Sequence, residues 1–299
     1  MFRAGKFIRA DFCDKLLRRL TAFLAVVGFA QFLITSGVLP RTLFMQELFY
    51  NDAYVDNVVY YSQDHYFRVL STYMEPSYYA PFLVGAFFYF LNDKSSMKRN
   101  EFLLFILALQ ILLTFSSTAY GATFVMMTFF LFSRAGNKKY KGSIIAIGII
   151  GCFPMFCVLF PVMDAVIFSK RSSGSWAARH YFNINAYSAF LNSPIFGVGY
   201  KQTRGSSLYF SLLGQLGLVG FGAYLMIMVP IVRLLFSKKA GKRVKRQYVG
   251  LCFAVLSVTV CQMIAIPDLD ICSYWMWMNL LALSYHSRQR RRGVIGGYA

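Results

Sequence analysis

The sequence predicts an all-α integral membrane protein, a polytopic bundle of about eight transmembrane helices with two long outer loops. The chain is 57% hydrophobic and only 14% charged, and its mean hydropathy is +0.50. Such a chain would expose too much apolar surface to be soluble. Several stretches approach the roughly 20 apolar residues that cross a bilayer. Because backbone groups in lipid must bond within the protein, these observations favour a helical bundle.

The apolar runs predict the individual spans. They lie at about 20–39, 77–91, 102–115, 119–133, 144–167, 208–235, 248–266 and 274–287. The first run is not interpreted as a cleaved signal peptide, because a basic segment precedes it and no small-residue cleavage site follows it. Ser116, Ser117 and Thr118 separate two short spans, so we expect a tight hairpin there. The prediction is a single membrane domain over 1–299, with basic tails at 1–19 and 288–299.

The basic residues predict the orientation. Of the 31 Lys and Arg residues, 24 fall in segments that share one side of the predicted membrane, namely 1–19, 92–101, 134–143, 233–247 and 288–299. Short loops that follow the positive-inside rule this closely place both termini in the cytoplasm. The net charge of +19 is therefore mostly a topology signal, with anionic lipids as a further partner. No aromatic stacking pattern accompanies the basic runs, so nucleic acid is not a predicted partner.

The cysteines and short motifs exclude several kinds of chemistry. Most of the six cysteines lie within predicted spans, which does not indicate a disulfide framework. The sequence contains no CxxC or HExxH spacing and no Walker or GxGxxG loop. We therefore expect no metal and no cofactor.

Two predicted outer loops, about 40–76 and 168–207, are long enough to hold a site. Both are rich in Tyr and Phe, which argues against disorder. Within the second, residues 170–207 carry five of the seven outer cations and no carboxylate, which predicts that this loop binds an anion. Asp268 and Asp270 form a carboxylate pair in the last outer turn, and two interpretations remain open: a site for a cation or sugar hydroxyl, or a solvated turn.

In the first loop, Arg68 and Glu75 are the candidate functional residues. The loop also contains many tyrosines, which suit sugar stacking but are equally ordinary residues of a membrane interface. Arg68 and Glu75 lie seven apart, so both would point to one face if the segment were helical. Pro76 would then begin the next span. The alternative is a surface Arg and a Glu that the helix dipole favours at a helix start.

In the second loop, the candidates surround a turn with the sequence SPIFGVGY. Its glycines would let the backbone approach a ligand closely. Arg179 suits a phosphate, because its planar fork offers bidentate donors and keeps its proton. His180 is either an acid or base or simply polar surface. The remaining candidates for substrate binding are Trp176, Tyr200, Lys201 and Arg204.

Three segments of the chain carry motifs of a known kind: FRVLSTYMEPSYYAPFLVG, LLTFSSTAYGATFVMM and the stretch that begins at Trp176. The first is similar to the Arg…(Glu)Pro motif that precedes a span in the O-antigen polymerase and O-antigen ligase superfamily. The second resembles that family's hairpin with a Ser-rich break. The stretch from Trp176 through SPIFGVGYKQTRGSSLYFSLLGQLGLVGFGAYL resembles its major outer loop, with an Arg-containing helix, a Pro-x-x-Gly-x-Gly turn and the following span. Together these segments cover about residues 60–235.

The resemblance implies a membrane glycosyltransferase at the outer face of the plasma (inner) membrane. Such enzymes use polyprenyl-diphosphate-linked oligosaccharides and need neither a nucleotide sugar nor a metal. The arginines that hold the diphosphate in the family correspond here to Arg68 and Arg179. They would stabilise the negative charge that grows on the departing lipid diphosphate. The partners implied are membrane lipids, a flippase and a chain-length regulator.

Departures from the family pattern favour a polymerase of O-antigen, capsule or exopolysaccharide. Ligases of the family carry His-Asn where this chain has Ser206 and Ser207, and the family's Glu is here Gln215. Family members also have more spans than are predicted here, so we expect that this chain lacks their first helices. The alternatives are ligation of a glycan to an acceptor, a flippase or transporter of lipid-linked oligosaccharides, and a structural subunit. Spans nearly free of charge, without an internal repeat, favour chemistry at the outer face over transport.

Overall fold

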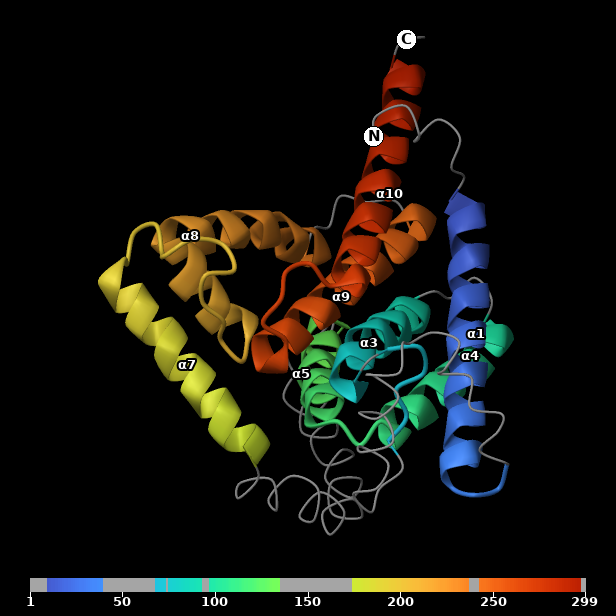
Figure 1. Cartoon of the computed structure of the whole chain (residues 1–299). Coiled ribbons are helices and arrows are strands. Elements are labelled where there is room, and N and C mark those ends of the chain that lie inside the picture. Colours follow the sequence, from blue (N-terminus) through green and yellow to red (C-terminus); the bar gives the residue numbers. More distant parts are fainter. Residues whose placement is uncertain are drawn as a thin grey trace. The chain divides into compact units, whose positions relative to one another are not determined.

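The computed structural model describes residues 10–39, 68–73, 75–92, 97–134, 174–236 and 242–296 (Figure 1). Within these residues the regular elements are helices, with no strand, as the sequence predicts. They are α1 (Ala10–Thr35), α3 (Pro76–Asn92), α4 (Met97–Leu113), α5 (Ser117–Arg134), α7 (Gly174–Asn192), α8 (Leu208–Phe236), α9 (Lys242–Ala265) and α10 (Cys272–Gly296). The predicted span 144–167 and most of the predicted outer loop 40–76 lie outside the described residues.

The helices overlap the predicted spans, and some of them are long and apolar enough to cross a membrane. Among the described residues, three helical segments meet both conditions: Cys13–Ile34, Leu208–Leu235 and Tyr248–Ala265. In the same part of the chain, two shorter apolar helices cover Asn100–Leu113 and Ser117–Ser133. These segments are consistent with a membrane protein, whereas the full bundle of about eight spans stays a prediction.

The chain divides into two compact units. The first contains Met1–Phe115, Lys239–Val258 and Asp270–Ala299. The second contains Ser116–Lys238 and Thr259–Leu269. Helices α1, α3, α4 and α10 therefore belong to the first unit and α5, α7 and α8 to the second, while α9 contributes to both.

The core of the first unit is built around α3, most of whose side chains are buried. The ring of Trp277 on α10 is fully buried and lies 6.4 Å from the ring of Phe82 and 5.7 Å from that of Tyr89. A Cβ on Gly85 would be only 2.7 Å from the Trp277 indole nitrogen, so glycine is what lets the ring sit against α3. Phe88 stacks on Phe253 of α9. Aromatic packing therefore holds α3 against its neighbours.

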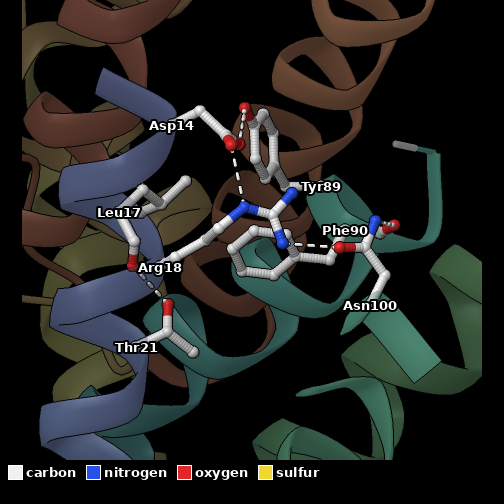
Figure 2. Close-up of polar contacts among 7 residues, drawn as sticks. All are labelled: Asp14, Leu17, Arg18, Thr21, Tyr89, Phe90 and Asn100. Atoms are coloured by element: carbon white, nitrogen blue, oxygen red, sulfur yellow. Dashed lines mark hydrogen bonds and ion pairs between the residues drawn. The ribbon is translucent and has the colours of Figure 1, made fainter. Parts of the chain in front are cut away.

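A buried polar cluster joins α1 to α3 and α4 (Figure 2). Arg18 donates from Nε to Asp14 Oδ2 at 2.8 Å and from Nη1 to Asn100 Oδ1 at 2.5 Å. The Tyr89 hydroxyl donates to the other Asp14 oxygen at 3.1 Å, and the guanidinium lies 4.9 Å from the centre of the Phe90 ring. Arg18 is only 9% exposed, so these partners replace the water that its charge would otherwise need.

In the second unit, α7 packs closely against α8. A Cβ on Gly214 of α8 would be 2.7 Å from the carbonyl oxygen of Ala186 on α7, and Ala186 is itself fully buried. Small residues on both sides therefore permit this approach. The 19 residues of α7 lie within the predicted outer loop 168–207, so that loop contains a helix, as the family resemblance implies.

Candidate functional site

Helix α8 is interrupted at Gly217, where φ is 62° and ψ is −161°. Figure 1 shows α8 changing direction along its length. A break of this kind leaves buried backbone groups in need of partners, and the loop before α8 supplies them. Four hydrogen bonds link the two: Val198 N to Gly214 O at 3.0 Å, Gly199 N to Gln215 O at 2.9 Å, Leu218 N to Pro194 O at 2.9 Å and Val219 N to Ile195 O at 3.1 Å. The SPIFGVGY segment is thereby fixed against the broken helix.

Two glycines make this junction possible. Gly197 has φ 69°, and a Cβ there would be 2.3 Å from the carbonyl oxygen of Gln215. A Cβ on Gly217 would be 2.4 Å from the carbonyl oxygen of Ile195. The sequence predicts that the loop glycines permit a close approach to a ligand. For Gly197 the structure shows a close approach to α8 instead.

The side chain of Gln215 holds the turn that carries the predicted cations. Its Oε1 accepts a hydrogen bond from Lys201 N at 3.2 Å, and its Nε2 donates to Thr203 O at 2.6 Å. Further along, Gly205 N donates to Ser211 Oγ and Ser206 N donates to Asn183 Oδ1. The sequence marks Gln215 only as a departure from a family Glu. The sequence does contain a signal for this role of Gln215. A side-chain amide within an apolar helix needs hydrogen-bond partners, because it is shielded from water.

On this turn, Tyr200, Lys201 and Arg204 lie together as exposed side chains. Lys201 Nζ is 5.5 Å from the centre of the Tyr200 ring, within the range of a cation–π contact. Lys201 itself has a positive φ of 62°, which the hydrogen bond from its backbone to Gln215 helps to hold. Three of the four predicted substrate-binding residues are therefore exposed on one turn. The fourth, Trp176, lies in the first turn of α7.

Arg204 has a counter-ion that sequence reasoning missed. Its Nη2 lies 3.1 Å from Asp268 Oδ2, and both side chains are partly exposed. Gln262 Nε2 donates to the backbone carbonyl of Asp268 at 2.9 Å, which fixes the turn on which Asp268 lies. An exposed pair of this kind contributes little to stability and exchanges readily with other ions. The Asp268 carboxylate is therefore paired with Arg204. Neither interpretation of the acidic turn, a cation or sugar site or a solvated turn, includes this ion pair.

Arg179 and His180 are exposed on α7, a helix whose sequence contains no carboxylate. This exposure suits contact with an anion. For His180 it leaves both interpretations open, a catalytic acid or base and a polar surface residue.

The segment 68–73 is not helical, so the condition under which Arg68 and Glu75 would share a helix face is not met. Arg68 Nε donates to Thr114 O at 3.3 Å, and Val69 N donates to Leu113 O at 2.9 Å. The amides of the next two residues both donate to Gln31 Oε1, at 3.1 and 2.9 Å. These partners, far away in sequence, take the donors that a helix would use.

Glu75 caps the start of α3. Its carbonyl accepts hydrogen bonds from Tyr78 N and Tyr79 N, and its Oε2 accepts one from Ser77 Oγ at 2.9 Å. Pro76 is the first residue of α3, as predicted. This geometry matches the alternative interpretation of Glu75, an acid that the helix dipole favours at a helix start. Nearby, burial raises the pKa of Tyr73 to about 12.

We predict that Gln215→Leu loosens the turn that carries the cations. The variant removes two hydrogen bonds and leaves Thr203 O and Lys201 N without these partners, at a cost of about 1–3 kcal/mol. Amide hydrogen exchange at residues 199–205 should become at least about tenfold faster. Gln202→Leu is the matched control, because Gln202 is an exposed glutamine of the same turn. Equal exchange in the two variants would contradict the assigned role of Gln215.

The candidate residues fall into two groups. Arg179, His180, Lys201 and Arg204 belong to the second unit, whereas Arg68 and Glu75 belong to the first. The structure describes no group of three or more His, Cys, Asp or Glu side chains that could hold a metal ion, within the residues it covers. In comparisons with protein-family models, characterised proteins and solved structures, the chain matches none of them.

Proposed function

We propose that this protein is a membrane glycosyltransferase that polymerises polyprenyl-diphosphate-linked oligosaccharides into a surface polysaccharide. The observation that carries the proposal is the turn after α7. It presents Lys201 and Arg204 on a backbone that α7 and α8 hold in place. Two exposed cations on a backbone held beside an apolar helix suit a ligand with a diphosphate head and a lipid tail. The family resemblance then indicates the reaction of such a ligand, the transfer of its oligosaccharide to an acceptor.

The proposed topology has about eight spans, with both termini in the cytoplasm. The turn and α7 then lie at the outer face, where lipid-linked oligosaccharides would be presented. Arg179 and Arg204 offer planar forks of donors that match phosphate oxygens. Asp268 is the ion-pair partner of Arg204, and the ligand diphosphate would replace it there.

In the proposed reaction, a hydroxyl of the acceptor sugar forms a bond to the anomeric carbon of the donor. The bond from that carbon to the diphosphate oxygen breaks, and the lipid diphosphate leaves with the electron pair. The proton of the hydroxyl passes to a base, for which His180 is the candidate on α7. Arg179 would stabilise the charge that develops on the leaving diphosphate, and the family resemblance assigns the same role to Arg68.

We predict that Arg179→Ala and Arg68→Ala each lower the amount of long-chain polysaccharide by about 100-fold or more, because each removes a donor to the leaving group. The measurement is polysaccharide chain length on a gel, with the amount of protein in the membrane determined in the same cells. Arg233→Ala is the matched control, since Arg233 is a partly exposed arginine in the last turn of α8. Normal chain lengths in the two site variants would contradict the site.

Deletion of the gene separates polymerase from ligase. A polymerase deletion should leave single repeat units on the carrier or on the cell surface. Long polymer that accumulates unattached would instead indicate ligation to an acceptor. Lipid-linked repeat units confined to the inner leaflet would indicate a flippase. Either of the last two results would replace the proposed function.

A further inference from the structure

The burial of α8 changes at its break. Before Gly217, the residues from Ser211 to Gln215 are all buried, and two of them are polar. Directly after the break, Leu218 is 56% exposed and Val219 is 54% exposed. Further apolar side chains of this second part, such as Met226 and Ile227, are also exposed. One helix therefore has a first part that is mostly buried and a second part with many exposed apolar side chains.

The length of the second part matches a bilayer. The apolar stretch Leu208–Leu235 has 28 residues, more than a membrane requires. The part after the break, 218–236, has about 19 residues and is therefore about 28 Å long. This length is close to the roughly 30 Å of the hydrocarbon layer. The second part of α8 is thus long enough to cross a bilayer by itself.

The tip of the preceding loop extends the bare apolar surface. Ile195 is 57% exposed and Phe196 is 72% exposed. They lie beside Leu218 and Val219, because the amides of those two residues donate to Pro194 O and Ile195 O. The amide of Gly197 is also satisfied, by Ser193 O at 2.9 Å. Irregular backbone can lie at membrane depth only where the protein satisfies it in this way.

We propose that the break at Gly217 marks the outer boundary of the hydrocarbon layer, and that Ile195 and Phe196 insert into lipid beside it. The second part of α8 would cross the membrane, and its first part would lie outside. Lys201 and Arg204 follow the tip within a few residues and would then lie at the level of lipid phosphates. The inference rests on α8 crossing a bilayer in the proposed orientation and does not depend on the proposed transfer reaction.

Charge complementarity identifies lipid as the occupant of this surface. The segment 174–207 carries cations and no carboxylate of its own. With the Asp268 carboxylate that pairs with Arg204 included, this surface still has more cations than anions, a balance suited to anionic headgroups next to apolar tails. An interface with another protein would be expected to carry a more mixed polar rim. A second copy of this chain would bring the same cations against each other.

Single cysteines in the full chain test the inference. Cys272 is an exposed native thiol, so the parent carries Cys272→Ser, and its residual labelling is subtracted. Phe196→Cys and Ile195→Cys probe the tip, Tyr209→Cys probes the first part of α8, and Gln202→Cys is the reference on the same side. Each variant is reconstituted into vesicles of phosphatidylethanolamine and phosphatidylglycerol. Each thiol is treated with a membrane-impermeant maleimide, and a bimane label on it is tested for quenching by brominated phosphatidylcholine.

We expect the thiols at 195 and 196 to react at least about tenfold more slowly than those at 202 and 209, because a thiol in hydrocarbon forms little thiolate. Bimane at 195 and 196 should be quenched by brominated lipid, and bimane at 202 and 209 should not. Reactivity at 195 and 196 equal to that at 202 would overturn the inference. Protection without quenching would also overturn it, because protein rather than lipid would then cover the tip. Quenching at 209 would overturn the assigned boundary.

Discussion

Gly217→Ala should destabilise the second unit by about 3 kcal/mol or more. The added methyl group would lie 2.4 Å from the carbonyl oxygen of Ile195 and 2.7 Å from the amide nitrogen of Gly197. The backbone conformation at Gly217 is also one that residues with a side chain rarely adopt. To relieve both problems, the loop must separate from α8, and the hydrogen bonds from Leu218 N and Val219 N are then lost. The loss of unfolding free energy is measured on the detergent-solubilised protein, by the fluorescence of a thiol-reactive dye or of tryptophan.

Two glycine variants serve as controls for this prediction. Gly222 lies on the same helix with open space around its Cβ position, so Gly222→Ala should be neutral or stabilising by about 0.5–1 kcal/mol. Gly37 has a positive φ of 79° but also open space, so Gly37→Ala isolates the backbone strain, at about 1–2 kcal/mol. A Gly217→Ala variant no less stable than Gly222→Ala would show that the junction does not hold the loop.

Arg18→Met should lower the free energy of unfolding by about 3–5 kcal/mol. Methionine retains the apolar length of the side chain but removes the charge, which leaves Asp14 with only the Tyr89 hydroxyl from this cluster. The oxygen of Asn100 also loses its donor. We expect the lower end of the range, because the Asp14 side chain is 24% exposed and can still reach water. Denaturant unfolding in detergent measures the change.

The neighbouring arginine provides the control. Arg19 is exposed on the same helix, so Arg19→Met should change stability by no more than about 0.5 kcal/mol. Asp14→Leu combined with Arg18→Met removes both charges, and this double variant should recover part of the loss. Equal stability of the Arg18 and Arg19 variants would mean that the cluster does not stabilise the packing of α1.

Much of the fold is set by local sequence. Long apolar runs cannot remain in water, and in lipid they must satisfy their own backbone groups, so they form helices wherever they occur. The starts of helices are equally local, as at Pro76, whose missing amide costs nothing in a first turn. The basic segments between the runs predict the orientation for a similar reason, since each segment acts close to its own span.

The segment 68–73 marks the limit of this reasoning. Its spacing permits a helix, but Gln31 and Leu113 accept hydrogen bonds from its amides, and neither is near it in sequence. Asp268 is a similar case. Its counter-ion Arg204 lies 64 residues away, so no local pattern identifies the pair.

The sequence alone therefore determined that the described chain is helical with apolar segments long enough to suit a membrane, and it determined the cationic character of residues 170–207. Only the tertiary structure decided where α8 breaks, and how the cations are held. Several glycines lie in the apolar stretch of α8, and a scale of helix propensities assigns the same value to all of them. Gly217 differs because the carbonyls of Pro194 and Ile195 lie within reach of the amides that come after it. A break in a helix becomes stable only where such partners exist, and their positions are a property of the folded chain.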